Sequence, residues 1–234
     1  MIEQRFRSGV RYLWNKPNDT FGPLNGAIVP NVGVATNLSY DGLDGHPAVI
    51  DPLLLLGNPA NVLGFAVGMV NVPYTWLDYA PRRTARVAIG VNDILSGYMS
   101  GCLIIRGTYG GAMSAFHVGT IDGDDAASRE SNRTVKQQFA QNLPADATGF
   151  NPLAAWPAPD ITAVQTNLGG PANSVSRIFA LMTTVGTFYS ILMLNVKDNT
   201  QQWQNPAGRR YWCVGGIRQM APMNRIMLMA RLVG

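Results

Sequence analysis

The alternation of apolar and polar positions predicts a chain built mainly of short β-strands. Apolar runs bounded by Gly, Pro and Asn recur along most of the sequence, which is typical of strands joined by loops. The longest uncharged run near the C-terminus, residues 178–196, is divided by Gly186 into two strand-sized pieces and is interpreted as a buried hairpin rather than a membrane-spanning helix. The other predicted strands are residues 27–30, 32–35, 48–56, 62–72, 86–91, 103–106, 210–217 and 225–233.

Two segments have a helical pattern instead. Residues 128–143 begin with N-cap candidates and end at Pro144, so they are predicted to form a helix. In residues 1–16 an apolar side chain recurs every four positions, which predicts a short amphipathic helix that lies on the sheet, with a membrane-surface or export role as the alternative. Arginines interrupt this segment, so it does not resemble a classical secretory signal. Its apolar residues are Ile2, Phe6, Val10 and Trp14.

These elements predict a fold of the α+β class. Neither a repeat of fixed period nor a low-complexity linker divides the sequence, so residues 1–234 are predicted to form a single domain. Two packed β-sheets, mixed or antiparallel and similar to a β-sandwich, with one or two flanking helices, would bury the apolar face of each strand.

Composition excludes several classes of protein. The chain has 234 residues, of which 47% are hydrophobic and 14% are charged, against about 25% charged in an average domain, so it is too apolar for a disordered protein. Only 3 Lys and 2 Glu are present, which argues against a helical bundle. The 2 cysteines are too few for a disulfide-stabilised scaffold. A globular, sheet-rich protein with a substantial core remains.

The net charge of +4 is spread unevenly, because residues 201–234 hold five arginines and no acidic residue. A basic end can serve nucleic acid or an acidic protein surface. These arginines are scattered along strand-like sequence, and no nucleic-acid-binding motif accompanies them. We therefore interpret them as a solvated strand face and do not expect nucleic acid as a partner.

Candidate chemistry is concentrated in residues 93–120. Cys102 follows the small residue Gly101, and a strand-like run, a glycine turn and His117 come after it. A cysteine is a nucleophile as the thiolate, which requires a nearby base or positive charge. If the glycine turn closes a hairpin, His117 can lie beside Cys102. Main-chain N–H groups of Gly101 and Cys102 could then face a developing oxyanion.

Spacing alone leaves a purely structural role for Cys102 open, because free cysteine is among the most buried residue types. Cys213, in a Tyr-Trp-Cys-Val-Gly context with no histidine after it, is expected to be structural. The residues Asp122, Asp124 and Asp125 could bind a cation, but the interpretation as a helix cap and a loop is simpler.

The segment from Ser96 to Cys102, followed by the glycine turn and His117, resembles the active-site segment of bacterial toxin glutamine deamidases. This family includes the Burkholderia lethal factor, the cytotoxic necrotizing factors and the chemoreceptor deamidases. The resemblance covers about residues 96–117. In the lethal factor and chemoreceptor enzymes a threonine precedes the cysteine by six positions, where this chain has Ser96 and so keeps the hydroxyl group.

The resemblance implies that Cys102 is the nucleophile, His117 the base and Ser96 the group that orients His117. It implies a cysteine-dependent hydrolase that converts a glutamine side chain of a host protein to glutamate, without a metal or organic cofactor. The protein would be a secreted or injected bacterial toxin or effector that acts in the reducing host cytosol, where an unpaired cysteine persists. Two alternatives stay open: a cysteine protease or transglutaminase with the same Cys-His pair, and a non-enzymatic β-sandwich binding module in which Cys102 is buried.

Overall fold

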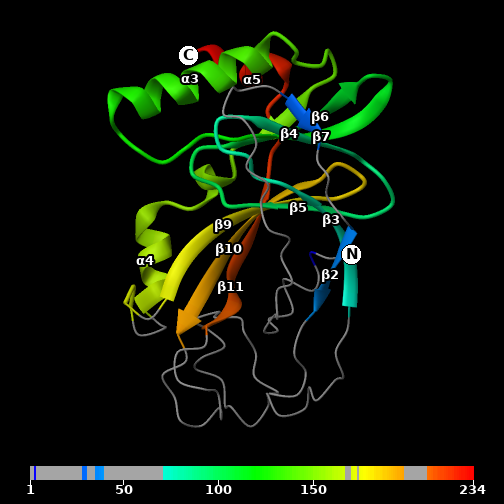
Figure 1. Cartoon of the computed structure of the whole chain (residues 1–234). Coiled ribbons are helices and arrows are strands. Elements are labelled where there is room, and N and C mark those ends of the chain that lie inside the picture. Colours follow the sequence, from blue (N-terminus) through cyan, green and yellow to red (C-terminus); the bar gives the residue numbers. More distant parts are fainter. Residues whose placement is uncertain are drawn as a thin grey trace.

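The computed structural model describes Glu3 and residues 28–30, 35–39, 71–166, 170–172, 174–197 and 210–234. The described strands form two sheets that pack face to face (Figure 1). The five-stranded sheet has the order β1 (Ile28–Pro30), β4 (Thr84–Ala88), β7 (Ala112–Val118), β6 (Leu103–Tyr109) and β8 (Thr148–Phe150). The six-stranded sheet has the order β11 (Arg210–Met220), β10 (Phe188–Lys197), β9 (Ser174–Met182), β5 (Ile94–Gly97), β3 (Asn71–Leu77) and β2 (Ala35–Ser39).

Both sheets are mixed. Strand β1 runs parallel to β4 in the first sheet, and β3 runs parallel to β5 in the second, whereas the other pairs are antiparallel. Three α-helices accompany them in the described residues: α3 (Ala126–Ala140), α4 (Ala158–Thr166) and α5 (Arg225–Val233). The α+β class with two packed sheets and flanking helices is thus confirmed.

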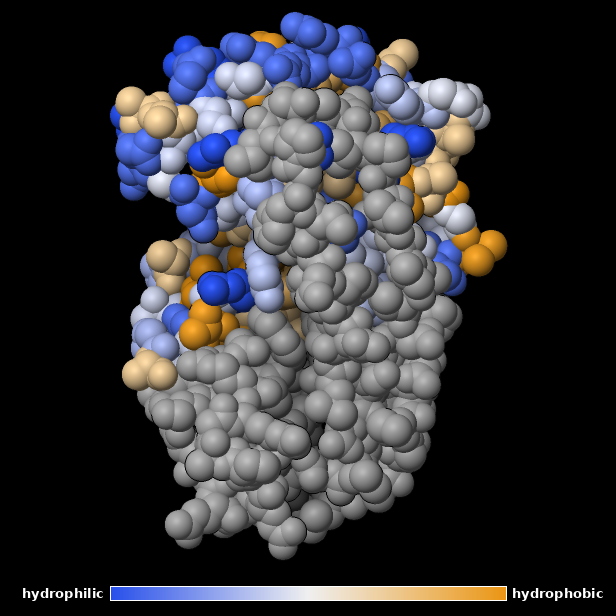
Figure 2. All heavy atoms as spheres, in the orientation of Figure 1, coloured by the Kyte–Doolittle hydropathy of each residue, from blue (hydrophilic) through white to orange (hydrophobic). Residues whose placement is uncertain are grey.

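The apolar residues are divided into two layers by the five-stranded sheet. Along β6, Leu103 and Ile105 point toward α3 and α5, whereas Ile104 points toward the six-stranded sheet, as the alternation of side chains along a strand requires. The layer under the helices includes Phe116 and Phe139. The outer side of α3 is polar, and Figure 2 shows hydrophilic residues over the top of the molecule where this helix lies.

Both hairpins predicted around glycines are confirmed. Strands β6 and β7 are joined at Gly110 and Gly111, which have φ angles of 58° and 81°. Positive φ at both central residues is the requirement of the tight turn that matches the twist of a hairpin. Strands β9 and β10 form the second hairpin, with Gly186 in its turn at a φ of 86°.

The helix predicted at residues 128–143 is observed as α3, and the acidic turn before it acts as its cap. The side chain of Asp125 accepts a hydrogen bond from the main-chain N–H of Ser128 at 2.9 Å. Such a cap satisfies one of the N–H groups that the first turn of a helix leaves without a partner.

The prediction of a strand at residues 225–233 was wrong, because this segment forms α5. Its N-cap is Asn224, whose side chain accepts a hydrogen bond from the N–H of Met227 at 3.0 Å. Leu228 and Leu232, four positions apart, are the residues that α5 buries, in the layer under α3. Packing of one helical face against α3 and the sheet therefore decides the structure of this apolar run.

The strand predicted at residues 210–217 is observed as part of β11. The strand predicted at residues 86–91 is observed in part: β4 begins at Thr84 and ends at Ala88, so residues 89–91 lie beyond it. The predicted amphipathic helix at residues 1–16 lies outside the described residues except for Glu3, which is helical. The predicted strand at 48–56 and most of that at 62–72 also lie outside them. In the described part of the chain, no helix is long and apolar enough to cross a membrane.

Candidate functional site

The three residues expected to carry the chemistry come from three chain segments that meet between the sheets. His117 lies on β7, opposite Ile104 of β6. Cys102 precedes Ile104 by two positions, and both belong to the layer of side chains between the sheets. Ser96 lies on β5, in the other sheet. Cys102 and His117 are 0% exposed and Ser96 is 1% exposed.

Ser96 and His117 are joined by a hydrogen bond that crosses from one sheet to the other. The hydroxyl of Ser96 donates its one proton to the carbonyl oxygen of Leu77 at 2.7 Å. Its oxygen also lies 2.7 Å from Nδ1 of His117 and must therefore accept a hydrogen bond from that nitrogen. The proton of the neutral imidazole is thus on Nδ1, and Nε2 carries the lone pair.

Nε2 of His117 has no hydrogen-bond partner among the described residues, although it is buried. Burial lowers the pKa of His117 from 6.5 to about 3, because the imidazolium would lose its hydration. The ring of Tyr79 packs against the imidazole, with the ring centroids 5.4 Å apart. At neutral pH the site therefore holds an uncharged imidazole with a lone pair available on Nε2.

The sulfur of Cys102 is hydrogen-bonded to Thr120. Sγ lies 3.4 Å from the hydroxyl oxygen of Thr120 and 3.8 Å from its carbonyl oxygen. Burial raises the pKa of the Cys102 thiol, and the charge of Asp122 raises it further. Hydrogen bonds to the side chain of Thr120 and to the main chain of Ser100 and Thr120 lower this pKa, but the effect of burial is larger. The thiol is therefore protonated at neutral pH in this arrangement.

The structure thus brings Ser96 and His117 into direct contact, whereas no hydrogen bond joins Cys102 to His117: the Cys102 sulfur, on the same face of the sheet, is hydrogen-bonded to Thr120. Sequence reasoning missed Thr120. It lies just beyond the end of β7, three positions after His117. Extending the register of the β6–β7 hairpin places Thr120 opposite Gly101, and the course of the chain after β7 brings its hydroxyl to the neighbouring Cys102.

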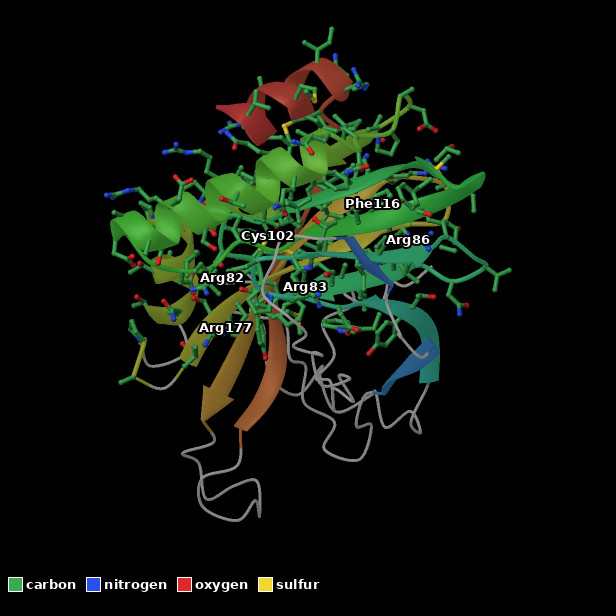
Figure 3. All side chains as sticks on the ribbon, turned by 45° about the horizontal axis from the view of Figure 1, so that its top comes forward. Arg82, Arg83, Arg86, Cys102, Phe116 and Arg177 are labelled. Carbon is green, nitrogen blue, oxygen red and sulfur yellow. The ribbon has the colours of Figure 1, made fainter. Side chains whose placement is uncertain are left out.

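The chain around Thr120 is held by the turn before β4. The N–H of Gly119 donates to the carbonyl of Arg83, and the N–H of Arg82 donates to the carbonyl of Gly119, both at 2.8 Å. A Cβ atom at Gly119 would lie 2.1 Å from the carbonyl oxygen of Ala80, so only glycine fits there. Figure 3 labels Arg82, Arg83 and Cys102 in this part of the molecule. The close approach of the two segments fixes the position of Thr120.

Gly101 adopts a φ of 102°, which strains any residue with a side chain, so it turns the chain directly before Cys102. Stabilisation of an oxyanion by the N–H groups of Gly101 and Cys102 stays a prediction. Cys213 lies on β11, opposite Leu194, and the strands β10 and β9 separate it from β5 in the same sheet. Within the described residues, no three His, Cys, Asp or Glu side chains lie close enough together to hold a metal ion.

Comparison of the chain with models of protein families, with curated proteins and with solved structures gave no match.

Proposed function

We propose that this protein is a cysteine-dependent hydrolase that deamidates a glutamine side chain on a protein substrate. The observation that carries the proposal is the state of His117: Ser96 holds its Nδ1–H at 2.7 Å, and its buried Nε2 has no partner among the described residues, on the face of the sheet where Cys102 lies. A base that is oriented by a third group and left open at its reactive nitrogen is what a cysteine nucleophile requires.

In this mechanism Cys102 and His117 both start uncharged, and opening of the site brings Sγ within hydrogen-bond reach of Nε2. Nε2 accepts the thiol proton as Sγ attacks the carboxamide carbon, and it then gives that proton to the departing ammonia. Water hydrolyses the resulting thioester, which releases glutamate and regenerates the thiol. Main-chain N–H groups at Gly101 and Cys102 stabilise the tetrahedral oxyanion. These steps use no metal or organic cofactor. Because Cys102 is fully buried, the site must open for the glutamine to reach it.

The resemblance of residues 96–117 to the toxin deamidases supplies the biological setting of the proposal. The protein would be a bacterial toxin or effector, and its substrate a host protein in the cytosol. Each turnover would leave one additional negative charge on that protein.

The experiment compares wild type, Cys102→Ser and Cys213→Ser after incubation with host-cell lysate, with peptide mass spectrometry to map conversions of glutamine to glutamate. We expect the same conversions with wild type and Cys213→Ser, and none with Cys102→Ser. The proposal is wrong if Cys102→Ser gives the wild-type map. New chain termini would indicate a protease instead, and glutamine-linked crosslinks would indicate a transglutaminase.

One observation favours the second candidate, a non-enzymatic binding module. The Cys102 side chain is wholly buried and hydrogen-bonded, as a structural cysteine would be. Alkylation by iodoacetamide at neutral pH separates the two candidates, with Cys213→Ser as the background so that one thiol reacts. A nucleophile gives a rate that falls in His117→Gln, which lacks the base. A structural cysteine gives a slow rate that is the same with and without His117.

A further inference from the structure

The partner of the Cys102 sulfur in this structure is a hydroxyl group rather than an imidazole. Thr120 is 2% exposed, and its oxygen lies 3.4 Å from Sγ and 3.5 Å from the carbonyl oxygen of Ser100. The latter contact is at the outer limit for a hydrogen bond between oxygens, whereas 3.4 Å is ordinary for sulfur, which has the larger radius. The sulfur is thus the better placed of the two partners for the one proton of this hydroxyl.

The carbonyl of Thr120 also contacts the sulfur. It lies 3.8 Å from Sγ, in reach of the thiol proton, and it accepts a hydrogen bond from the hydroxyl of Tyr79 at 2.7 Å. The ring of Tyr79 also packs on His117. One tyrosine therefore contacts both the imidazole and the residue that binds the sulfur.

We propose that Thr120 is a positioning residue for the nucleophile: its hydroxyl donates a hydrogen bond to the Cys102 sulfur and stabilises the thiolate while His117 holds the proton. This inference rests on the proposed function and extends it. Once Sγ has lost its proton to Nε2, the sulfur can only accept hydrogen bonds, and the hydroxyl of Thr120 at 3.4 Å is placed to donate one. The carbonyl of Thr120 keeps the hydrogen bond from Tyr79.

The test is the pKa of Cys102, which needs no substrate. In the Cys213→Ser background, cysteine labelled at Cβ gives one NMR signal whose chemical shift follows ionisation of the thiol as the pH is raised. The titratable groups that the described contacts place at this site are Asp122, whose charge acts on the thiol, Tyr79, which contacts Thr120, and His117, and all of them are retained in the variants. Thr120→Val removes the hydroxyl at nearly constant volume, and Thr120→Ser keeps it.

We expect Thr120→Val to raise the pKa of Cys102 by about one to two units, the effect of one hydrogen bond to a charged group, and Thr120→Ser to remain within about half a unit of the parent. An unchanged pKa in Thr120→Val, or an equal rise in both variants, would overturn the inference. If Thr120→Val does not fold, Thr120→Ala is used with the same criteria. The outcome is independent of the lysate experiment: a pKa that behaves as expected, with no deamidation by wild type, refutes the proposed function and leaves the hydrogen bond established.

Discussion

Replacement of Ser96 by alanine tests the arrangement of the imidazole directly. The variant removes the acceptor of the buried His117 Nδ1–H and the donor to the carbonyl of Leu77. A buried donor without a partner costs about 1–3 kcal/mol, and the second hydrogen bond contributes about 1 kcal/mol. We therefore expect the free energy of unfolding to fall by about 2–4 kcal/mol. In a protein of this size the corresponding fall in Tm is about 4–16 °C.

The assay needs to separate loss of stability from loss of the tautomer. Ser190→Ala is the matched control, because the hydroxyl of Ser190 is equally buried, donates to the carbonyl of Pro152 at 2.7 Å and accepts from Trp156 at 2.9 Å. Both variants should lose comparable stability in denaturant unfolding. Only Ser96→Ala should move the imidazole proton of His117 from Nδ1 toward Nε2, which is measured by nitrogen NMR of labelled histidine.

Ser96→Thr gives a third point, because it keeps the hydroxyl and adds a methyl group. The buried site should lose about 1–3 kcal/mol through overpacking while the proton stays on Nδ1. The reasoning is refuted if Ser96→Ala unfolds within about 0.5 kcal/mol of wild type, the range of substitutions that break no buried contact. It is also refuted if the tautomer of His117 is the same in Ser96→Ala as in wild type.

Two further predictions follow from the same site. The pKa of His117 is about 3 in the folded chain and 6.5 as its ordinary value, so between these values the unfolded chain alone binds the proton, and stability falls as the pH is lowered. From pH 6.5 to pH 5 the free energy of unfolding, measured in urea, should fall by about 2 kcal/mol in wild type and should change little in His117→Gln. The aspartates whose pKa is lowered titrate below this pH range and do not contribute. In Gly119→Ala the free energy of unfolding should fall by at least about 3 kcal/mol, or the variant should fail to fold, because the new Cβ would lie 2.1 Å from the Ala80 carbonyl oxygen. Gly90 has open space around it, so the free energy of unfolding of Gly90→Ala should remain within about 0.5 kcal/mol of wild type.

Local signals in the sequence were sufficient for the hairpins and for α3. Gly110 and Gly111 occupy the positions that need a positive φ, and Asp125 caps the helix that follows it, so each prediction depended on a few neighbouring residues. The same reasoning was wrong for residues 225–233. A short apolar run is compatible with either a buried strand or a helix, and the choice here is made by contacts of Leu228 and Leu232 under α3.

The site shows the same division between local and tertiary information. The hairpin predicted Cys102 and His117 on adjoining segments, because the glycine turn determines the register. The contact of Ser96 with His117 depends on how two sheets pack, and the contact of Thr120 with Cys102 depends on where the chain goes after β7 ends. Neither follows from spacing, since the first is set by the packing of the two sheets and the second by the course of the chain beyond the paired ends of β6 and β7. The parallel pairs β1–β4 and β3–β5 were likewise not predicted.

The hydrogen bond between Ser96 and His117 has a mechanical consequence, because its two ends belong to different sheets. A hydrogen bond is lost when its two heavy atoms separate well beyond about 3.2 Å, and it weakens steeply when its donor angle falls below about 120°. Sliding of one sheet over the other would therefore release the imidazole before it disrupted either sheet. The orientation of His117 therefore depends on the alignment of the two sheets. Substitutions far from Cys102 that shift this alignment would change the orientation of the imidazole.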